Sequence, residues 1–338
     1  MLRPAYRITV GDQVIDTTIE ARASTALELT VRLDLDTPAD AVTLRQGQVG
    51  GLRAQPGDTM SVDLGYADED KLVRVLTGSV VAVEPGLQTQ RITGHSGGDT
   101  LLRTFMDRTF EDTTAGAIVR ALATAAGLDV ASVEDGPALP AYVIDGRRPV
   151  ARHVRDLAYL AGFDTWVTAD GKLVFEGFTG NRTVHRLRYG EHVLHAELRR
   201  SRPRAGSVQV WGDSPGAGGD ESWAWLTKDF GPRHGTSGSA PPMLLIERAA
   251  VRTGRLAAAV AQAAAETLTE QALHGRVRIQ GRPQLLLGQL IRLEGFPDRA
   301  GVDALEGTYQ VRAVRHHLTK AAGLTTDVAF RSLQGVAP

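Results

Sequence analysis

Apolar and polar residues alternate along much of the first hundred positions. Residues 6–10, 27–35, 60–64 and 72–83 follow this pattern, and turn residues such as glycine and proline separate them. A period of two places one face of a strand on a core and the other in solvent. Short strands at this spacing predict an antiparallel barrel or sandwich, and we expect residues 1–98 to form a first β-barrel domain.

The middle of the chain has a different pattern. Apolar residues recur at helical spacing in residues 113–127 and 150–161, and the threonines at 113 and 114 are candidate N-caps for the first of these helices. Residues 166–175 predict a hairpin. We therefore expect a small α+β insert over residues 99–180.

The last third combines an alanine-rich helix with strands punctuated by glycine. Residues 251–273 predict one long helix laid against a barrel, because four apolar residues recur at four-residue spacing: Leu256, Val260, Ala264 and Leu268. Residues 213–242 are rich in Gly, Ser and Pro and predict a loop too polar to join a core. Together these segments predict a second β-barrel domain over residues 181–338, so the fold class is mainly β with an α+β insert.

The two β regions resemble each other in sequence. The run that starts at Gly57 and the run that starts at Gly288 share apolar positions and a Gly-aromatic-x-Asp pattern, with one residue of slack. In this alignment Gly78 corresponds to Gly307. The pattern predicts a duplication that gives two similar barrels, and a homotrimer would then present six similar units. Chance similarity between glycine-rich strands is the alternative.

Composition excludes several classes of protein. The 338 residues have room for about two or three domains. A net charge of −1 argues against a general nucleic-acid binder, and the absence of cysteine excludes disulfides and thiolate sites. The N-terminus lacks the apolar core of a signal peptide, and the apolar run at 256–268 is shorter than the roughly 20 residues of a membrane span. We expect a protein that folds in the cytoplasm, without membrane insertion.

One short motif is typical of a hydrolase. Residues 94–98 match the G-x-S-x-G elbow, in which a strained serine between a parallel strand and a helix is exposed beside backbone donors. A β-rich region precedes this motif, and no HGGG-like loop lies upstream. We therefore interpret Ser96 as part of a loop between the first barrel and the insert and predict no catalytic residue. A serine hydrolase that uses Ser96 is an alternative function.

Histidines cluster at two places, at His185, His192 and His195 and at the adjacent His316 and His317. Neighbouring residues of a strand point to opposite faces, so the adjacent pair is unsuited to share a metal ion. We expect satisfied or solvated histidines, no metal site and no cofactor.

Charge is distributed unevenly. Residues 182–204 hold seven arginines against two glutamates, whereas residues 1–70 carry twelve acidic residues against six arginines. This asymmetry is consistent with ordinary solvated strand faces. It is equally consistent with charge complementarity between neighbouring subunits, or with a basic lining that faces a cargo or nucleic acid.

The order of these segments resembles that of a known family. Residues 56–66 read PGDTMSVDLGY, and the runs at 108–128, 155–163 and 171–175 follow before the C-terminal helix and strands. In this order they resemble the phage late control protein D family, which includes the gp27-like hubs of contractile tails and the hub part of VgrG-type spike proteins. The resemblance covers nearly the whole chain, and the order of the motifs carries it.

The resemblance implies two tandem gp27-like barrels per chain and a structural role. Three copies would form a homotrimeric ring in a baseplate that adapts the sixfold inner tube to the threefold spike, with a possible cargo in the lumen. The implied partners are the inner tube protein, a gp5-like or VgrG-tip-like spike, and other baseplate or LysM-type adaptor proteins. Because spike fusions continue beyond the hub and this chain ends at Pro338, we expect the spike to be a separate chain.

The expected location is the cytoplasm, with assembly into a phage-tail-like particle or virion. Function as a monomeric β-rich binding module is a further alternative to the structural role.

Overall fold

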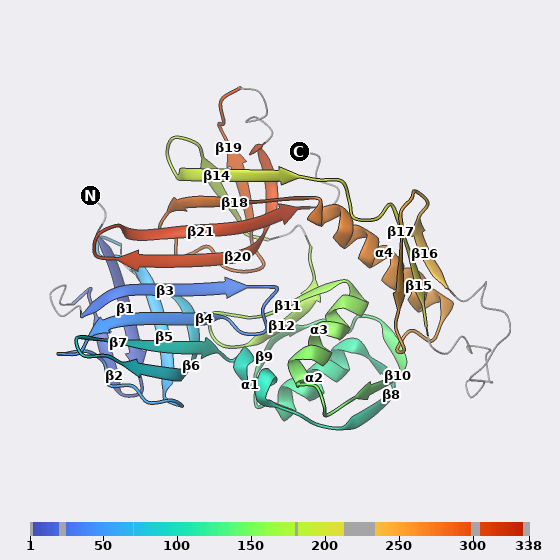
Figure 1. Cartoon of the computed structure of the whole chain (residues 1–338), viewed down its shortest axis with the longest axis horizontal. Helices are drawn as coiled ribbons and strands as arrows, with labels where there is room; N and C mark the ends of the chain where they lie inside the picture. The colour runs from blue at the N-terminus through green and yellow to red at the C-terminus, as the bar shows by residue number, and fades with distance from the viewer. Residues whose placement is uncertain are drawn as a thin grey trace.

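The computed structural model describes residues 3–19, 25–69, 71–179, 182–212, 234–298 and 305–333. Strands account for 50% of the chain and helices for 16%, which confirms the predicted mainly β fold class. Figure 1 shows one large curled sheet beside a body that holds the helices.

The first half of the sheet comes from the N-terminal region. Its strands are β1 (Pro4–Val10), β2 (Gln13–Asp16), β3 (Ala26–Asp34), β4 (Ala41–Gly47), β5 (Thr59–Tyr66), β6 (Val73–Pro85) and β7 (Thr89–Ser96). They pair in the order β3-β4-β7-β6-β5-β1-β2, and every pairing is antiparallel. Alternation within each strand buries one face, as Val42 and Leu44 of β4 illustrate, and this face forms the core.

The second half comes from the C-terminal region and joins the first edge to edge. Its strands are β13 (Val184–Arg188), β14 (Val193–Arg200), β18 (Leu273–Gln280), β19 (Leu290–Glu294), β20 (Gly307–Thr319) and β21 (Gly323–Ser332). They pair in the order β14-β18-β21-β20, and β19 connects β20 to β13. Because β20 also pairs antiparallel with β3, both halves form one 13-stranded sheet (Figure 1).

The two halves are built alike. The order β3-β4-β7-β6-β5 has its counterpart in β14-β18-β21-β20-β19, with antiparallel pairing throughout. The likeness ends at the next strand, because β1 is antiparallel to β5 whereas β13 is parallel to β19. The topology supports the duplication that the sequence pattern predicts.

The structure corrects the register of that duplication. Met60 lies opposite Gly78, and Ile291 lies opposite Tyr309. If Gly57 corresponds to Gly288, then Met60 corresponds to Ile291, and Gly78 therefore corresponds to Tyr309. The alignment of Gly78 with Gly307 is therefore wrong by two residues. It followed the glycine and the hydroxyl residue that both runs share, whereas the residues that face each other across the paired strands set the register.

β-Bulges occur at matching places in the two halves. Val81 of β6 is an extra residue relative to β7, and Arg312 of β20 is an extra residue relative to β21. Likewise, Leu27 is extra in β3 and Leu194 is extra in β14. A bulge bends its strand and increases the local twist, so these four positions help the sheet to curl.

The helical body begins after β7. Its first part contains α1 (Gly98–Arg103), β8 (Arg108–Thr114), α2 (Ala115–Ala125), β9 (Val130–Val133), β10 (Ala138–Ile144), α3 (Val150–Ala161), β11 (Phe163–Val167) and β12 (Leu173–Gly177). Thr114 caps α2 by accepting a hydrogen bond from the backbone N–H of Ala117, and Gly162 ends α3 with a φ of 68°. The hairpin predicted at 166–175 corresponds to β11 and β12, so the α+β insert is confirmed.

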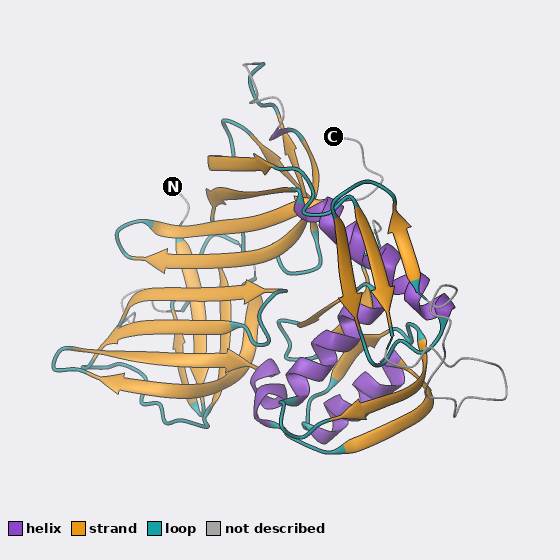
Figure 2. Cartoon of the chain, turned by 45° about the vertical axis from the view of Figure 1, so that its right-hand side comes forward, coloured by secondary structure: helices purple, strands orange, loops and turns teal. Residues whose placement is uncertain are grey.

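A second segment completes this body. Between β14 and β18 the chain forms β15 (Ser207–Trp211), β16 (Gly235–Gly238), β17 (Met243–Glu247) and α4 (Gly254–Gln271). The first half of the sheet has only the turn at residues 35–40 in the corresponding place. Figure 2 shows α4 and its three strands beside the other helices, away from most of the sheet.

Two hydrophobic cores reflect this arrangement. One contains buried residues of both halves of the sheet, such as Val62 and Val311. The other combines the insert with the second segment, so that Leu157 of α3 and Val260 of α4 share a core with Val210 of β15. The long helix thus packs mainly within the helical body. The division at residues 98 and 180 stays a prediction.

One end of the predicted loop at 213–242 is a strand instead. Gly235 in β16 is buried so close to α4 that a Cβ atom would lie 2.0 Å from the backbone carbon of Ala257. The glycine content that indicated a loop therefore serves a close contact between a strand and a helix. Residues 213–233 of this prediction lie outside the described residues.

Candidate functional site

Ser96 lies at the end of β7 and is buried. Its Oγ accepts a hydrogen bond from the backbone N–H of Asp40 at 3.0 Å, and its own N–H donates to the Asp40 carbonyl at 2.9 Å. β7 runs antiparallel to both β4 and β6. Among the described residues Asp112 is the one non-glycine with a positive φ, so Ser96 lacks the strained backbone of a nucleophile elbow. Its contacts tie β7 to the turn before β4.

The histidines named in the sequence analysis have separate partners. These pairs are His185 with Gln289, His192 with the backbone N–H of Arg188, His195 with Glu197, His316 with Thr326, and His317 with Thr30. The described residues contain no group of three or more side chains arranged to hold a metal ion.

His316 is the most deeply buried of these histidines. Its Nδ1 lies 3.0 Å from the Thr326 hydroxyl. Burial lowers the pKa of His316 to about 4, and a backbone hydrogen bond with Leu285 opposes this shift only in part. The imidazole is therefore neutral at physiological pH and serves as a core residue.

Six of the seven arginines in the segment 182–204 are exposed, and Arg182 is half-buried. Arg182 forms an ion pair with the buried Glu176, and Arg188 contacts Glu191 at 3.2 Å. Arg199 and Arg200 also lie exposed, at the end of β14. In the described part of the chain, β14 pairs with β18 on one side and with no strand on the other. These arginines therefore lie at an outer edge of the 13-stranded sheet.

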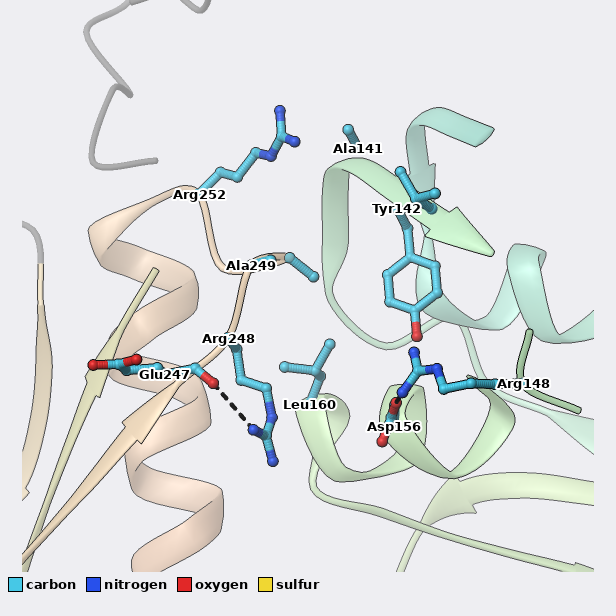
Figure 3. A pocket seen from close by; sticks show the side chains of 11 residues that line it. Ala141, Tyr142, Arg148, Asp156, Leu160, Glu247, Arg248, Ala249 and Arg252 are labelled. Atoms are coloured by element: carbon cyan, nitrogen blue, oxygen red, sulfur yellow. Dashed lines mark hydrogen bonds and ion pairs between the residues drawn. The ribbon is translucent and has the colours of Figure 1, made fainter. Parts of the chain in front are cut away.

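A pocket of about 350 Å³ separates the two segments of the helical body (Figure 3). Tyr142 and Arg148 line one side, where Arg148 pairs with Asp156 at 3.1 Å. Arg248 lies on the other side, 5.2 Å from the ring centroid of Tyr159. Burial raises the pKa of the Tyr142 hydroxyl, which therefore stays protonated. The pocket offers hydrogen-bond donors and positive charge, but these groups do not make a nucleophile paired with a base.

A buried charge cluster joins the helical body to the sheet. Asp164 of β11 accepts hydrogen bonds from Arg312 at 2.6 Å and from the Gln310 side chain at 2.6 Å. Arg331 lies 3.7 Å from Asp164 and 3.1 Å from Glu270 of α4. The side chains of Arg312, Arg331 and Asp164 are each less than 15% exposed, so solvent screens these contacts weakly.

The pKa shifts in this cluster reflect a balance between burial and pairing. Burial alone would raise the pKa of Asp164, but the nearby charges of Arg312 and Arg331 and the hydrogen bonds hold it below its usual value. Burial raises the pKa of Glu270, and the charge of Arg331 opposes this increase. Arg312 also contacts Asp36 in the turn after β3 at 2.7 Å. The cluster thus joins β11, α4 and the seam between β20 and β3.

The bulge at Arg312 places this side chain in the cluster. Because Arg312 is the extra residue relative to β21, its carbonyl accepts a hydrogen bond from Leu35 N–H at 3.0 Å while its guanidinium reaches Asp164 and Asp36. In a regular strand the side chains would alternate strictly between the two faces of the sheet, without the one-residue shift that the bulge at Arg312 introduces.

Solved structures with the same architecture identify the fold. A prophage MuSo2 43 kDa tail protein from Shewanella oneidensis superposes with a TM-score of 0.74 at 16% identity, over 97% of this chain and 98% of the other. The chain has the fold of phage tail proteins. A tail protein from Neisseria meningitidis matches this tail-protein fold similarly, with a TM-score of 0.73, 14% identity, and 98% and 97% coverage.

A more distant neighbour has the tail-protein fold in a secretion system. An Escherichia coli component of the type VI secretion system, described as similar to the T4 tail proteins gp27 and gp5, matches with a TM-score of 0.59 and 10% identity. The match covers 92% of this chain and 74% of that one. No protein-family model matches the sequence, and no curated protein matches it. In the described residues, no helix of this tail-protein fold combines the length and apolar character of a membrane span.

Proposed function

We propose that this protein is a structural hub of a contractile tail or injection-system baseplate. Three copies form a ring that adapts the sixfold inner tube to the threefold spike. The duplicated five-stranded unit carries the proposal, because two similar units per chain give six similar units around a threefold axis. The tail-protein fold of the solved neighbours supports it.

The partners in this proposal follow from the two symmetries. The inner tube contacts the face where the six similar units repeat, and a spike protein contacts the face where the three chains differ. Adaptor proteins of the LysM type bind the outer surface, the lumen can hold a cargo, and the assembled particle is the working location. Anchoring and symmetry matching need no reaction at any of these surfaces.

Assembly with the spike tests the hub function. We expect the full chain, co-expressed with the spike protein of the same gene cluster, to elute at the mass of three chains plus spike and to give ring-shaped particles in negative-stain images. Light scattering after gel filtration measures the mass. A protein that stays monomeric, with neither spike nor tube protein retained in pull-downs, would contradict the proposal and favour a monomeric binding module.

The Ser96→Ala variant separates the hub from a hydrolase. Because Ser96 Oγ accepts a hydrogen bond from Asp40 inside the fold, we expect alanine to cost roughly 1 kcal/mol of stability and to leave any background ester hydrolysis unchanged. The measurement is hydrolysis of short-chain nitrophenyl esters by both proteins, with thermal unfolding as a check of folding. A hydrolysis rate that exceeds the buffer control and is lost in Ser96→Ala would establish the enzyme instead.

A further inference from the structure

The duplication gives the seam between the two halves of the sheet an equivalent position elsewhere in the fold. Within the chain, the C-terminal half of β20 pairs with β3, from Ala313 opposite Asp34 to Thr319 opposite Glu28. In the duplicated unit β20 corresponds to β6, and β3 corresponds to β14. An equivalent seam would therefore join β6 to β14. Within one chain these two strands lie at opposite ends of the run β14-β18-β21-β20-β3-β4-β7-β6 (Figure 1).

Both edges needed for this second seam are open in the described part of the chain. The pairing of β6 with β5 ends at Ser79, so beyond Val80 strand β6 pairs only with β7. The outer edge of β14 pairs with no described strand. Open strand edges are templates for another strand, and proteins normally cover or pair them.

We propose that β6 of one copy pairs antiparallel with the end of β14 of a second copy. This inference rests on the proposed ring and specifies its interface. It commits to a second copy as the partner, because the same chain already makes the equivalent pairing between β20 and β3.

The matching bulges fix the register of the proposed seam. Val81 corresponds to Arg312, and Leu194 corresponds to Leu27. Transferring the β20–β3 register then places Ala82 opposite Ser201, Val83 opposite Arg200 and Glu84 opposite Arg199 of the second copy. The bond from Leu35 N–H to the Arg312 carbonyl has its counterpart between Arg202 N–H and the Val81 carbonyl.

Charge and proline positions suit this register. Glu84, which contacts Arg91 of its own chain at 3.2 Å, and Arg199 are both exposed, and directly opposite charges on neighbouring strands attract. The equivalent positions within the chain hold Arg315 and Arg32, which cannot form such a pair. Pro85 on β6 and Pro203 after β14 lack a backbone N–H, so they bound the pairing to residues 81–84 and 199–202.

Introduced cysteines test the register directly, because the natural chain has no cysteine. We expect the full-length Ala82→Cys/Ser201→Cys variant, purified with its spike, to form covalent dimers and trimers on non-reducing gels under mild oxidation. Directly opposite positions satisfy the geometry of a disulfide. The matched control Ala82→Cys/Leu194→Cys separates the two positions along the strand, and we expect at least tenfold less cross-linking from it.

Charge reversal tests the same contact without cysteine. We expect Glu84→Arg and Arg199→Glu each to raise the dissociation constant of the ring at least tenfold, and the double variant to recover most of the loss. Glu111→Arg, an exposed change on β8, should leave assembly unchanged. A ring that forms normally but shows neither cross-linking nor charge dependence would overturn the proposed seam and leave the hub function intact. A chain that forms no ring, even with its spike, would overturn both.

Discussion

The Asp164→Ala variant is expected to unfold with a free energy about 3–5 kcal/mol lower than that of the unmodified protein. Removing this carboxylate leaves the side chains of Arg312 and Arg331 buried at the seam without their shared acceptor. Arg331 keeps Glu270, but Arg312 keeps only the exposed carboxylate of Asp36, so its buried charge is poorly compensated and the loss exceeds what the pair itself contributes.

Urea unfolding followed by tryptophan fluorescence measures this loss, and Trp166 lies two residues from Asp164 on the same strand. Asp135→Ala is the matched control, because Asp135 forms an ion pair of 2.8 Å with Arg120 in which both side chains are more than 40% exposed. We expect that control to cost less than about 1 kcal/mol. Equal losses for the two variants would contradict a stabilising role for the cluster. A double-mutant cycle with Arg312→Ala should show losses that are less than additive.

The second large effect concerns Asp40, whose stability contribution depends on pH. Burial raises the pKa of Asp40 to about 7; the hydrogen bond from Asp34 N–H lowers it, and the charge of Asp34 raises it further. The unfolded chain releases this proton near pH 3.8, whereas the folded chain retains it until about pH 7. The folded state therefore binds more protons in this window, and the free energy of unfolding falls as the pH rises through it.

Asp40→Asn is expected to remove this penalty while keeping an oxygen acceptor for Asp34 N–H. The stability of the variant relative to the unmodified protein should increase by roughly 3 kcal/mol between pH 4.5 and pH 8, at no more than about 1.4 kcal/mol per pH unit. Thermal unfolding of both proteins at several pH values measures the difference between their free energies of unfolding. Titratable groups that both proteins contain, such as His316, contribute equally to each and cancel in this difference. Asp12→Asn, an exposed turn control, should track the unmodified protein. A difference that does not change with pH would contradict the assignment.

Much of the fold was predictable because local patterns agree with it. Alternation identified the sheet strands, and the threonine signal marked the start of α2. The repeat was also visible, although its register was not. Strand register depends on which residues face each other across the sheet, and a bulge such as that at Val81 shifts this pairing without an obvious sequence signal.

The charge cluster illustrates what the sequence concealed. Asp164 and Glu270 are far from Arg312 and Arg331 along the chain and meet only because two separate segments form one helical body. The alternation of β21 gave no signal, because Arg331 is in phase with Asp327 and Ala329 on the partly exposed face, where an arginine is ordinary. The partner itself could not be inferred without the packing of β11 against β20.

The long excursion between β14 and β18 has a consequence for synthesis. In the first half of the sheet, β4 follows β3 after a short turn, so that hairpin can close as soon as it leaves the ribosome. By contrast, β14 must wait for residues 201–272, roughly 4–14 s at about 5–20 residues per second. During this interval neither edge of β14 has its strand partner, and the exposed side chain of Leu194 is available for wrong contacts. Slower translation or lower growth temperature should therefore affect the yield of this protein mainly through its second half.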